Sequence, residues 1–156
     1  MATSALLKLD GQVQGWIKGG VTQKGREGLI EVTSWSWGAE RNSQAQQPAG
    51  PATASEFHIT KRRDRGTPLL LNAFRDNERF DEWRFDLYDP SIQGLEVNTM
   101  RVELENAYLV SDRYGGVETG ATSAPDHEEL TFVFEKITVT WLDGNITGTL
   151  DLGQES

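Results

Sequence analysis

Apolar and polar residues alternate along several segments of this chain, and this period of two restricts the fold to one built mainly from strands. A strand sends successive side chains to opposite faces, so alternation indicates a sheet with one buried side. In the clearest case Trp83, Phe85 and Leu87 are predicted to point inward, and Arg84 and Asp86 are predicted to point outward. We therefore expect a mainly β protein.

A second alternating stretch changes its apolar face part-way. Ile30 and Val32 occupy one face of the predicted strand, whereas Trp35 and Trp37 occupy the other. A strand can carry apolar residues on both faces without exposing them where a barrel or a neighbouring subunit covers each side. Trp35 and Trp37 are therefore candidate interface residues.

Trp141, in another segment, falls on a regular inward face and is predicted to lie in the core.

Two long segments nearer the C-terminus interrupt their alternation and resume it in the opposite phase. The changes fall near Glu105-Asn106 and near Glu135-Lys136. A β-bulge, which is one extra residue in a strand, produces such a change and bends the strand. Two bulges predict strands that curl, so we expect a barrel.

Only one segment has helical periodicity. Thr67 is the predicted N-cap and Pro68 the first-turn proline, and Leu70, Leu71 and Phe74 follow at helical spacing. We expect a single helix of about three turns.

Three segments without apolar periodicity are predicted loops: 19–28, 39–55 and 113–127. Loops as long as the second and third are usually functional or mobile when they occur in a compact domain. The 39–55 segment is polar, and we expect it to project and to contact an adjacent subunit. Its candidate interface residues are Gln44, Gln46, Gln47 and Pro48.

Composition excludes several classes of protein. The chain has 156 residues, a net charge of −9 and no cysteine, which excludes disulfide scaffolds, thiolate metal sites and cysteine nucleophiles. Residues 102–156 carry only Arg113 and Lys136 against eleven acidic side chains. An acidic chain is a poor ligand for nucleic-acid phosphates. The acidic third is either solvated surface or a surface that faces a neighbouring subunit.

Targeting signals are not visible in the sequence. The N-terminus has no combination of basic residues, long apolar run and small-residue cleavage site, so no Sec signal peptide is expected. No apolar run approaches the roughly 20 residues that span a bilayer. We expect a protein without membrane insertion that is made in the cytoplasm.

The basic run Lys61-Arg62-Arg63-Asp64-Arg65 allows two interpretations. A phosphate or nucleic-acid site would need several cations on one surface. Asp64 interrupts the run, the chain is acidic and no glycine-rich phosphate loop is present, so ion pairs with neighbouring carboxylates are favoured.

Other candidate groups give no catalytic prediction. Glu103 and Glu105 would share a strand face, as a carboxylate dyad can, but a solvated face is the favoured interpretation. His58 is expected on a strand surface and His127 in an acidic turn, and neither accompanies a nucleophile motif. We predict no catalytic, cofactor-binding or metal-binding residue, no cofactor and no enzyme activity.

Five segments in order carry a family resemblance. They are residues 9–15, 30–38, 57–71, 102–111 and 128–141, of which the stretch from Lys61 to Pro68 is the most characteristic. Together they resemble the haemolysin-coregulated protein (Hcp) family, the tube protein of bacterial type VI secretion.

The resemblance implies a two-sheet β-barrel with one flanking helix, the whole of 1–156 being a single tube domain. It implies rings of six subunits that stack into a tube, which a contracting sheath expels without a Sec signal. It also implies partners: further copies of the chain, effector proteins in the ring lumen, and the sheath and spike of the machine.

Two alternatives stay open at this point. The chain could be the tube protein of a related phage-tail-like contractile injection system, or a small β-barrel enzyme or ligand carrier. The segment after Gly38 and the extension 143–156 depart from the family pattern, so the resemblance does not extend to ring-to-ring contacts or effector choice.

Overall fold

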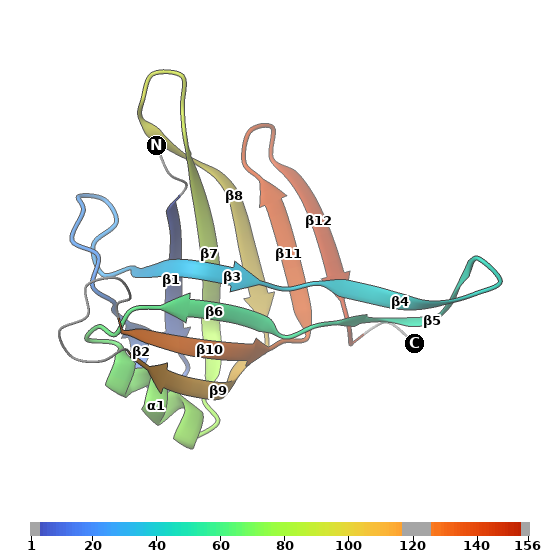
Figure 1. Cartoon of the computed structure of the whole chain (residues 1–156), viewed down its shortest axis with the longest axis horizontal. Coiled ribbons are helices and arrows are strands. Elements are labelled where there is room, and N and C mark those ends of the chain that lie inside the picture. The colour runs from blue at the N-terminus through green and yellow to red at the C-terminus, as the bar shows by residue number, and fades with distance from the viewer. Residues whose placement is uncertain (1–3, 117–125, 154–156) are drawn as a thin grey trace.

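The computed structural model describes residues 4–116 and 126–153. Within them the chain forms strands and a single helix (Figure 1). The strands are β1 Ser4–Gly11, β2 Gly15–Ile17, β3 Ile30–Ser36, β4 Ala39–Gln44, β5 Gln47–Ala54, β6 Phe57–Lys61, β7 Arg79–Pro90, β8 Glu96–Glu105, β9 Ala107–Gly115, β10 His127–Val133, β11 Lys136–Trp141 and β12 Ile146–Asp151, and the helix is α1 Thr67–Arg75.

Six strands close into a barrel. Their order is β7-β9-β10-β6-β3-β1, and β1 pairs with β7 to complete the circle. The second half of β7 pairs with β8, and β11 and β12 continue from there as a second sheet. Helix α1 packs beside β9 at one end of the barrel (Figure 1). The predicted two-sheet β-barrel with one flanking helix is confirmed.

An aromatic cluster fills the middle of the barrel. The ring centroid of Phe57 lies 4.8 Å from that of Trp83 and 5.7 Å from that of Phe85, edge to face in both cases. Phe132 lies 5.6 Å from Trp83 on the other side. Edge-to-face contacts add to the stabilisation from burial. The inward prediction for Trp83 and Phe85 is confirmed, and Leu87 is half-buried at the margin of the core.

Asp86 points away from the aromatic core, as predicted, but side chains on that face cover it. Its side chain is buried, with Oδ1 2.7 Å from Nε of Arg101 and Oδ2 3.2 Å from Nε of Arg84. The amide of Asn98 donates a further hydrogen bond of 3.1 Å. Side chains from β7 and β8 thus shield the carboxylate from water, and they replace the water molecules as its hydrogen-bond and ion-pair partners.

The two predicted bulges are complete interruptions of strand pairing. β8 gives way to β9 at Asn106, which has a positive φ of 52°. β10 gives way to β11 beside Glu135, whose N–H donates to the carbonyl of Glu105 at 3.0 Å. At these adjacent corners the chain passes between the barrel and the second sheet. The apolar face changes because the layer against which the strand packs changes.

Helix α1 is capped one residue earlier than predicted. Gly66 is the N-cap and Thr67 the first helical residue, without a side-chain cap. Leu70 is completely buried, whereas Leu71 and Phe74 are 48% and 41% exposed. The helix therefore covers the barrel with a narrow face and leaves an apolar outer face.

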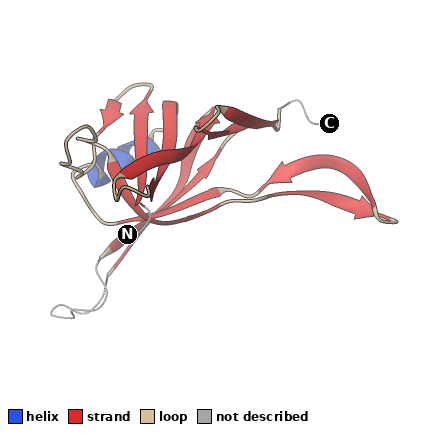
Figure 2. Cartoon of the chain, turned by 90° about the horizontal axis from the view of Figure 1, so that it is seen from above, coloured by secondary structure: helices blue, strands red, loops and turns tan. Residues whose placement is uncertain are grey.

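The segment 39–55, predicted as a loop, is the hairpin β4–β5, which projects far from the barrel (Figures 1 and 2). Its turn consists of Ala45 and Gln46, both at positive φ, 53° and 66°, as a type I′ turn requires. The sequence does not predict these strands, because they show no alternation of apolar and polar residues. Alternation is absent because every side chain of β4 is exposed.

The other two predicted loops have different outcomes. Segment 19–28 is irregular, as predicted. Residues 113–115 instead form the end of β9, and His127 begins β10. The intervening residues 117–125 lie outside the described part of the chain.

Candidate functional site

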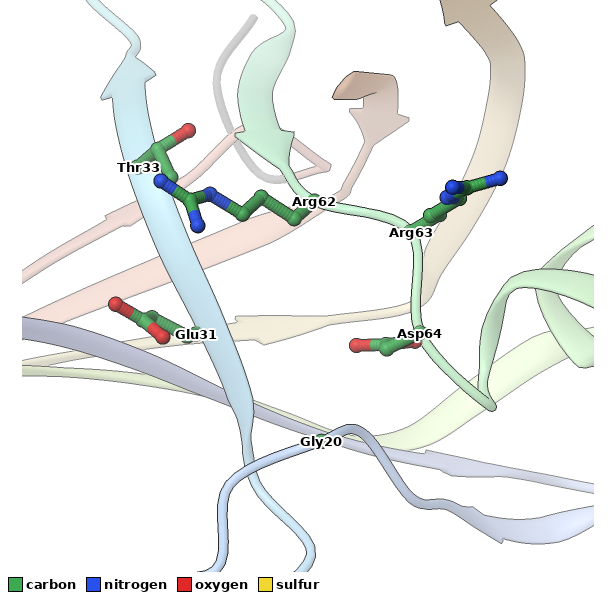
Figure 3. A pocket seen from close by; sticks show the side chains of 6 residues that line it. All are labelled: Gly20, Glu31, Thr33, Arg62, Arg63 and Asp64. Carbon is green, nitrogen blue, oxygen red and sulfur yellow. The ribbon is translucent and has the colours of Figure 1, made fainter. Parts of the chain in front are cut away.

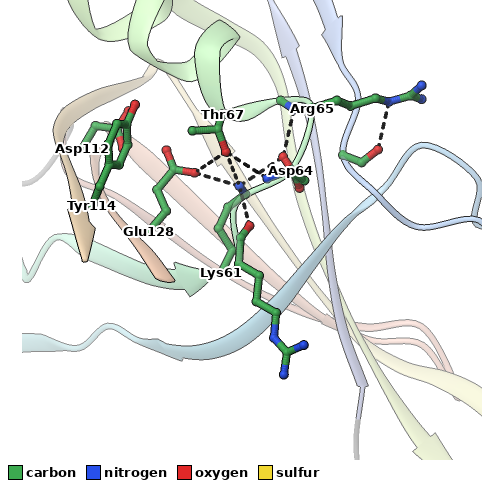
Figure 4. A network of polar contacts seen from close by, with 10 residues as sticks. Lys61, Asp64, Arg65, Thr67, Asp112, Tyr114 and Glu128 are labelled. Atoms are coloured by element: carbon green, nitrogen blue, oxygen red, sulfur yellow. Dashed lines mark hydrogen bonds and ion pairs between the residues drawn. The ribbon is translucent and has the colours of Figure 1, made fainter. Parts of the chain in front are cut away.

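A buried ion pair lies where β6 meets helix α1. Lys61 has no exposed surface, and its Nζ lies 2.8 Å from Oε1 of Glu128 and 3.2 Å from Oδ1 of Asp64 (Figure 4). The ammonium also donates to the carbonyl of Arg62 at 3.0 Å. A buried charge is tolerated only where it is paired and hydrogen-bonded, and Lys61 meets both conditions.

The turn between β6 and α1 is held by short hydrogen bonds. The hydroxyl of Thr67 accepts from the N–H of Asp64 at 3.0 Å and donates to Glu128 at 3.0 Å. Nε of Arg65 donates to the carbonyl of Gly19 at 3.1 Å. The turn therefore ties together β6, α1, β10 and the 19–28 loop. This explains physically why the 61–68 segment has so characteristic a sequence.

The remaining arginines of the run flank a cleft of about 130 Å³ (Figure 3). Arg62 reaches across β3 toward Thr33, above Glu31, whereas Arg63 points away and its Nε lies 2.9 Å from Asp126. Ligand sites usually enclose about 300 to 1,000 Å³, and this cleft is smaller than that range. The predicted ion pairing of the basic run is confirmed here and in the buried pair.

Sequence reasoning missed Glu78, which holds the turn between β1 and β2. Its buried carboxylate accepts the backbone N–H groups of Val13 and Gln14 at 2.8 and 2.7 Å. A side-chain Cβ at Gly11 would collide with this carboxylate. The glycine in the 9–15 segment is therefore needed for the close approach of Glu78.

The two histidines occupy surface positions. Nδ1 of His58 lies 3.2 Å from the hydroxyl of Thr131 on the neighbouring strand, and His58 is exposed. The expected acidic turn around His127 is instead the start of β10, where the ring lies 3.8 Å from Glu129. His58 therefore pairs with a side chain on the neighbouring strand, and His127 pairs with a side chain on its own strand.

The paired glutamates lie on a solvated strand face, as predicted. Glu103 and Glu105 are both exposed, and Glu105 lies 3.4 Å from Lys136. Within residues 4–116 and 126–153, no group of three or more His, Cys, Asp and Glu side chains could hold a metal ion. In the described part of the chain, no helix has the length and apolar character needed to cross a membrane.

Both candidate interface tryptophans pack against the barrel core. The ring centroid of Trp35 lies 6.1 Å from that of Phe57 and 5.2 Å from that of Phe85, and Trp37 lies 6.5 Å from Phe57. Trp35 keeps 37% of its surface exposed. These residues stabilise the subunit itself, and their contribution to an interface stays a prediction.

The structure brings the other candidate interface residues together at the tip of the hairpin. Gln44, Gln46, Gln47 and Pro48 are all exposed there. At the hairpin base, the N–H of Gly38 donates to the hydroxyl of Ser55 at 2.6 Å, and the N–H of Ser55 donates to the carbonyl of Gly38 at 2.7 Å. The base is thus fixed, although the hairpin has almost no core of its own.

An exposed apolar groove lies between the end of the β7–β8 hairpin and the end of the β11–β12 hairpin. The sequence did not predict it. It encloses about 500 Å³, and its apolar walls are Pro90, Val97, Trp141 and Leu142. Trp141 is 47% exposed, so its predicted place in the core is wrong. Ile137, at the start of β11, is buried in the core, whereas the end of the strand at Trp141 extends beyond the part of the subunit that would cover it. Exposed apolar patches of this kind typically mark protein interfaces.

Comparison with known proteins decides the family. Residues 6–141 match the family described as "Type VI secretion system effector, Hcp". The chain belongs to the Hcp family. The resemblance predicted from the five ordered segments is confirmed, and this Hcp protein is a tube subunit of a type VI secretion system. The matched region ends at Trp141, so β12 and the predicted extension lie beyond it.

Relatives match the Hcp chain over nearly its whole length. The "Major exported protein" of Pseudomonas aeruginosa is 27% identical, over 97% of this chain and 96% of its own. A mutant Hcp1 protein from E. coli is 26% identical, with a TM-score of 0.86, over 97% of this chain and 99% of its own. "Secreted protein Hcp3" from P. aeruginosa shares the fold, with 24% identity, a TM-score of 0.78 and coverage of 96% and 98%.

Proposed function

We propose that six copies of this Hcp protein close into a ring and that rings stack into the secretion tube. In this proposal the whole of 1–156 acts as one structural domain and not as an enzyme. The observation that carries the proposal is a pair of unlike surfaces on one subunit. One is the projecting polar hairpin β4–β5, and the other is the exposed apolar groove. Head-to-tail contacts close as rings or extend as stacks, and we assign the groove to the ring contact and the hairpin to the stacking contact.

The ring is tested by the mass of the protein in solution. We expect light scattering after size exclusion to give six times the 17.4 kDa of one chain. Trp141→Ser should lower this mass, because it removes the largest side chain of the groove, while thermal unfolding of the subunit changes little. Leu71→Ser, at a position equally exposed on α1, is the matched control and should keep the ring. A strictly monomeric protein at high concentration would favour a β-barrel ligand carrier instead.

Salt should separate the ring from the tube. Residues 1–101 hold equal numbers of basic and acidic side chains, whereas residues 102–156 are strongly acidic. If basic side chains of the first part face the acidic third between rings, stacking gains Coulomb attraction, which salt screens over about 8 Å. Exposed pairs contribute only about 0–1 kcal/mol each. Sedimentation should therefore show fewer stacks at high salt with the ring intact. Stacking that strengthens with salt would mean that apolar contacts dominate.

The proposed partners follow from the same role. We propose that the ring lumen holds effector proteins, that the tube contacts the sheath and spike of the machine, and that the protein is made in the cytoplasm and exported without a Sec signal. The family match and the exported relative support this assignment. Immunoblots of culture medium should detect the protein only when the contractile machine is intact.

A further inference from the structure

Two carboxyl groups lie against each other behind the buried lysine, and the tube role does not use them. Asp112 comes from β9 and Glu128 from the neighbouring strand β10 (Figure 4). Glu128 is 1% exposed and Asp112 is half-buried. Neither Oε2 of Glu128 nor Oδ1 of Asp112 has a hydrogen-bond donor, although both atoms are buried.

The nearby donors are already used. The ammonium of Lys61 has three protons, and it lies within hydrogen-bond distance of Oε1 of Glu128, Oδ1 of Asp64 and the carbonyl of Arg62. The hydroxyl of Thr67 also donates to Oε1 of Glu128. No donor from β6 or α1 therefore remains for the second oxygen of Glu128.

The nearest donor on β9 is also occupied. The hydroxyl of Tyr114 lies 3.3 Å from Oδ2 of Asp112 and donates to it. This contact leaves Oδ1 of Asp112 without a partner, as Oε2 of Glu128 is, and the two carboxyl groups lie close together (Figure 4). A single proton held between these two oxygens would satisfy both.

We propose that Asp112 and Glu128 share one proton, and that this proton holds β9 and β10 against the first turn of helix α1. We call this arrangement the latch. The charges come closest to balance in this state, because Asp112 and Glu128 then carry one negative charge between them instead of two. Lys61 neutralises one carboxylate, and Asp64 takes part of the same ammonium. Loss of the shared proton would leave Asp112 charged beside Glu128. Arg63 and His127 line the cavity next to Glu128, but Arg63 pairs with Asp126 and the ring of His127 lies 3.8 Å from Glu129.

The electrostatics of Asp112 agree with a shared proton. Burial, followed by its hydrogen bond to Glu128 and the charge of Glu128, raises the pKa of Asp112 to about 8, which Tyr114 and Lys61 lower only in part. Burial and the two carboxylates also raise the pKa of Tyr114 to about 12. An acid that binds its proton more tightly when folded stabilises the fold fully below its unfolded pKa, near 3.9 for aspartate. That stability declines as pH rises and is lost above about pH 8.

Asp112→Asn tests the latch because an amide can donate permanently to Glu128. We expect the thermal stability of the wild-type protein to fall between about pH 4 and pH 8, and the variant to show a much smaller fall. Glu129→Gln, on β10 but with a side chain 53% exposed, is the control and should keep the wild-type slope. An Asp112→Asn protein with the full wild-type slope would overturn the proposal.

A spectroscopic measurement keeps the test valid if the variant fails to fold. In the wild-type protein with carbon-13-labelled aspartate, one carboxyl resonance should stay in its protonated form at neutral pH and titrate near pH 8. Hydrogen exchange of the first turn of α1 should accelerate over the same range. Every aspartate titrating near its ordinary pKa would contradict the shared proton, whatever the assembly state.

Discussion

Lys61→Met should lower the free energy of unfolding by about 3–5 kcal/mol, the usual cost of removing one partner from a buried pair. The substitution leaves the carboxylate of Glu128 buried beside Asp112 without its main cation. Denaturant unfolding, followed by circular dichroism, measures the loss. Because the turn also anchors α1, we expect the subunit to become more susceptible to proteolysis there.

Two further variants serve as controls for the effect of Lys61→Met. Arg62→Met, one residue along and exposed, should change stability by less than about 0.5 kcal/mol. The double variant Lys61→Met with Glu128→Leu should recover much of the loss, because well-packed apolar residues often replace a buried pair without cost. A Lys61→Met protein no less stable than Arg62→Met would show that the pair does not stabilise the barrel.

Removal of the hairpin should abolish stacking while the subunit stays folded. Arg41 and Ala52 face each other across the hairpin, so residues 42–51 can be replaced by Asn-Gly, which suits a two-residue type I′ turn. The deleted segment is almost entirely exposed, and thermal unfolding should therefore change little. Electron microscopy should show rings without tubes.

The matched control changes only the turn. Replacing Ala45 and Gln46 with Asn and Gly keeps the hairpin length and relieves the positive φ of two residues that rarely adopt it. This protein should form tubes as the wild type does. Normal tubes from the shortened protein would contradict a role for the hairpin in stacking.

Some elements of the fold could be predicted from local patterns, and others could not. The barrel strands around Trp83 and Phe85 show alternation because one face packs on the aromatic core. The hairpin β4–β5 shows none, because both its faces are exposed. Pro48 and Pro51 also argue against a strand. Among the described residues, however, β5 pairs only with β4, and prolines are tolerated on such open edges.

The candidate site was predictable only in part. The basic run indicated that Lys61 would find a carboxylate, but not which one, because Glu128 lies 67 residues away. Glu78 and Asp112 carry no local signal at all, since their roles depend on the strands that fold beside them. The error at Trp141 has the same origin: alternation predicts which residues share a face, and only the tertiary fold determines whether that face is covered.

The pairing of β1 with β7 has a consequence for synthesis on the ribosome. Leu7 on β1 lies opposite Phe85 on β7, so the first strand of the barrel is made long before the partner of its second edge. At about 5–20 residues per second, this interval lasts roughly 4–16 seconds. Throughout it the apolar face of β1 has only part of its native cover, and long-range pairing is slow to form. Until β7 emerges, one edge of β1 is therefore open to pairing with another chain.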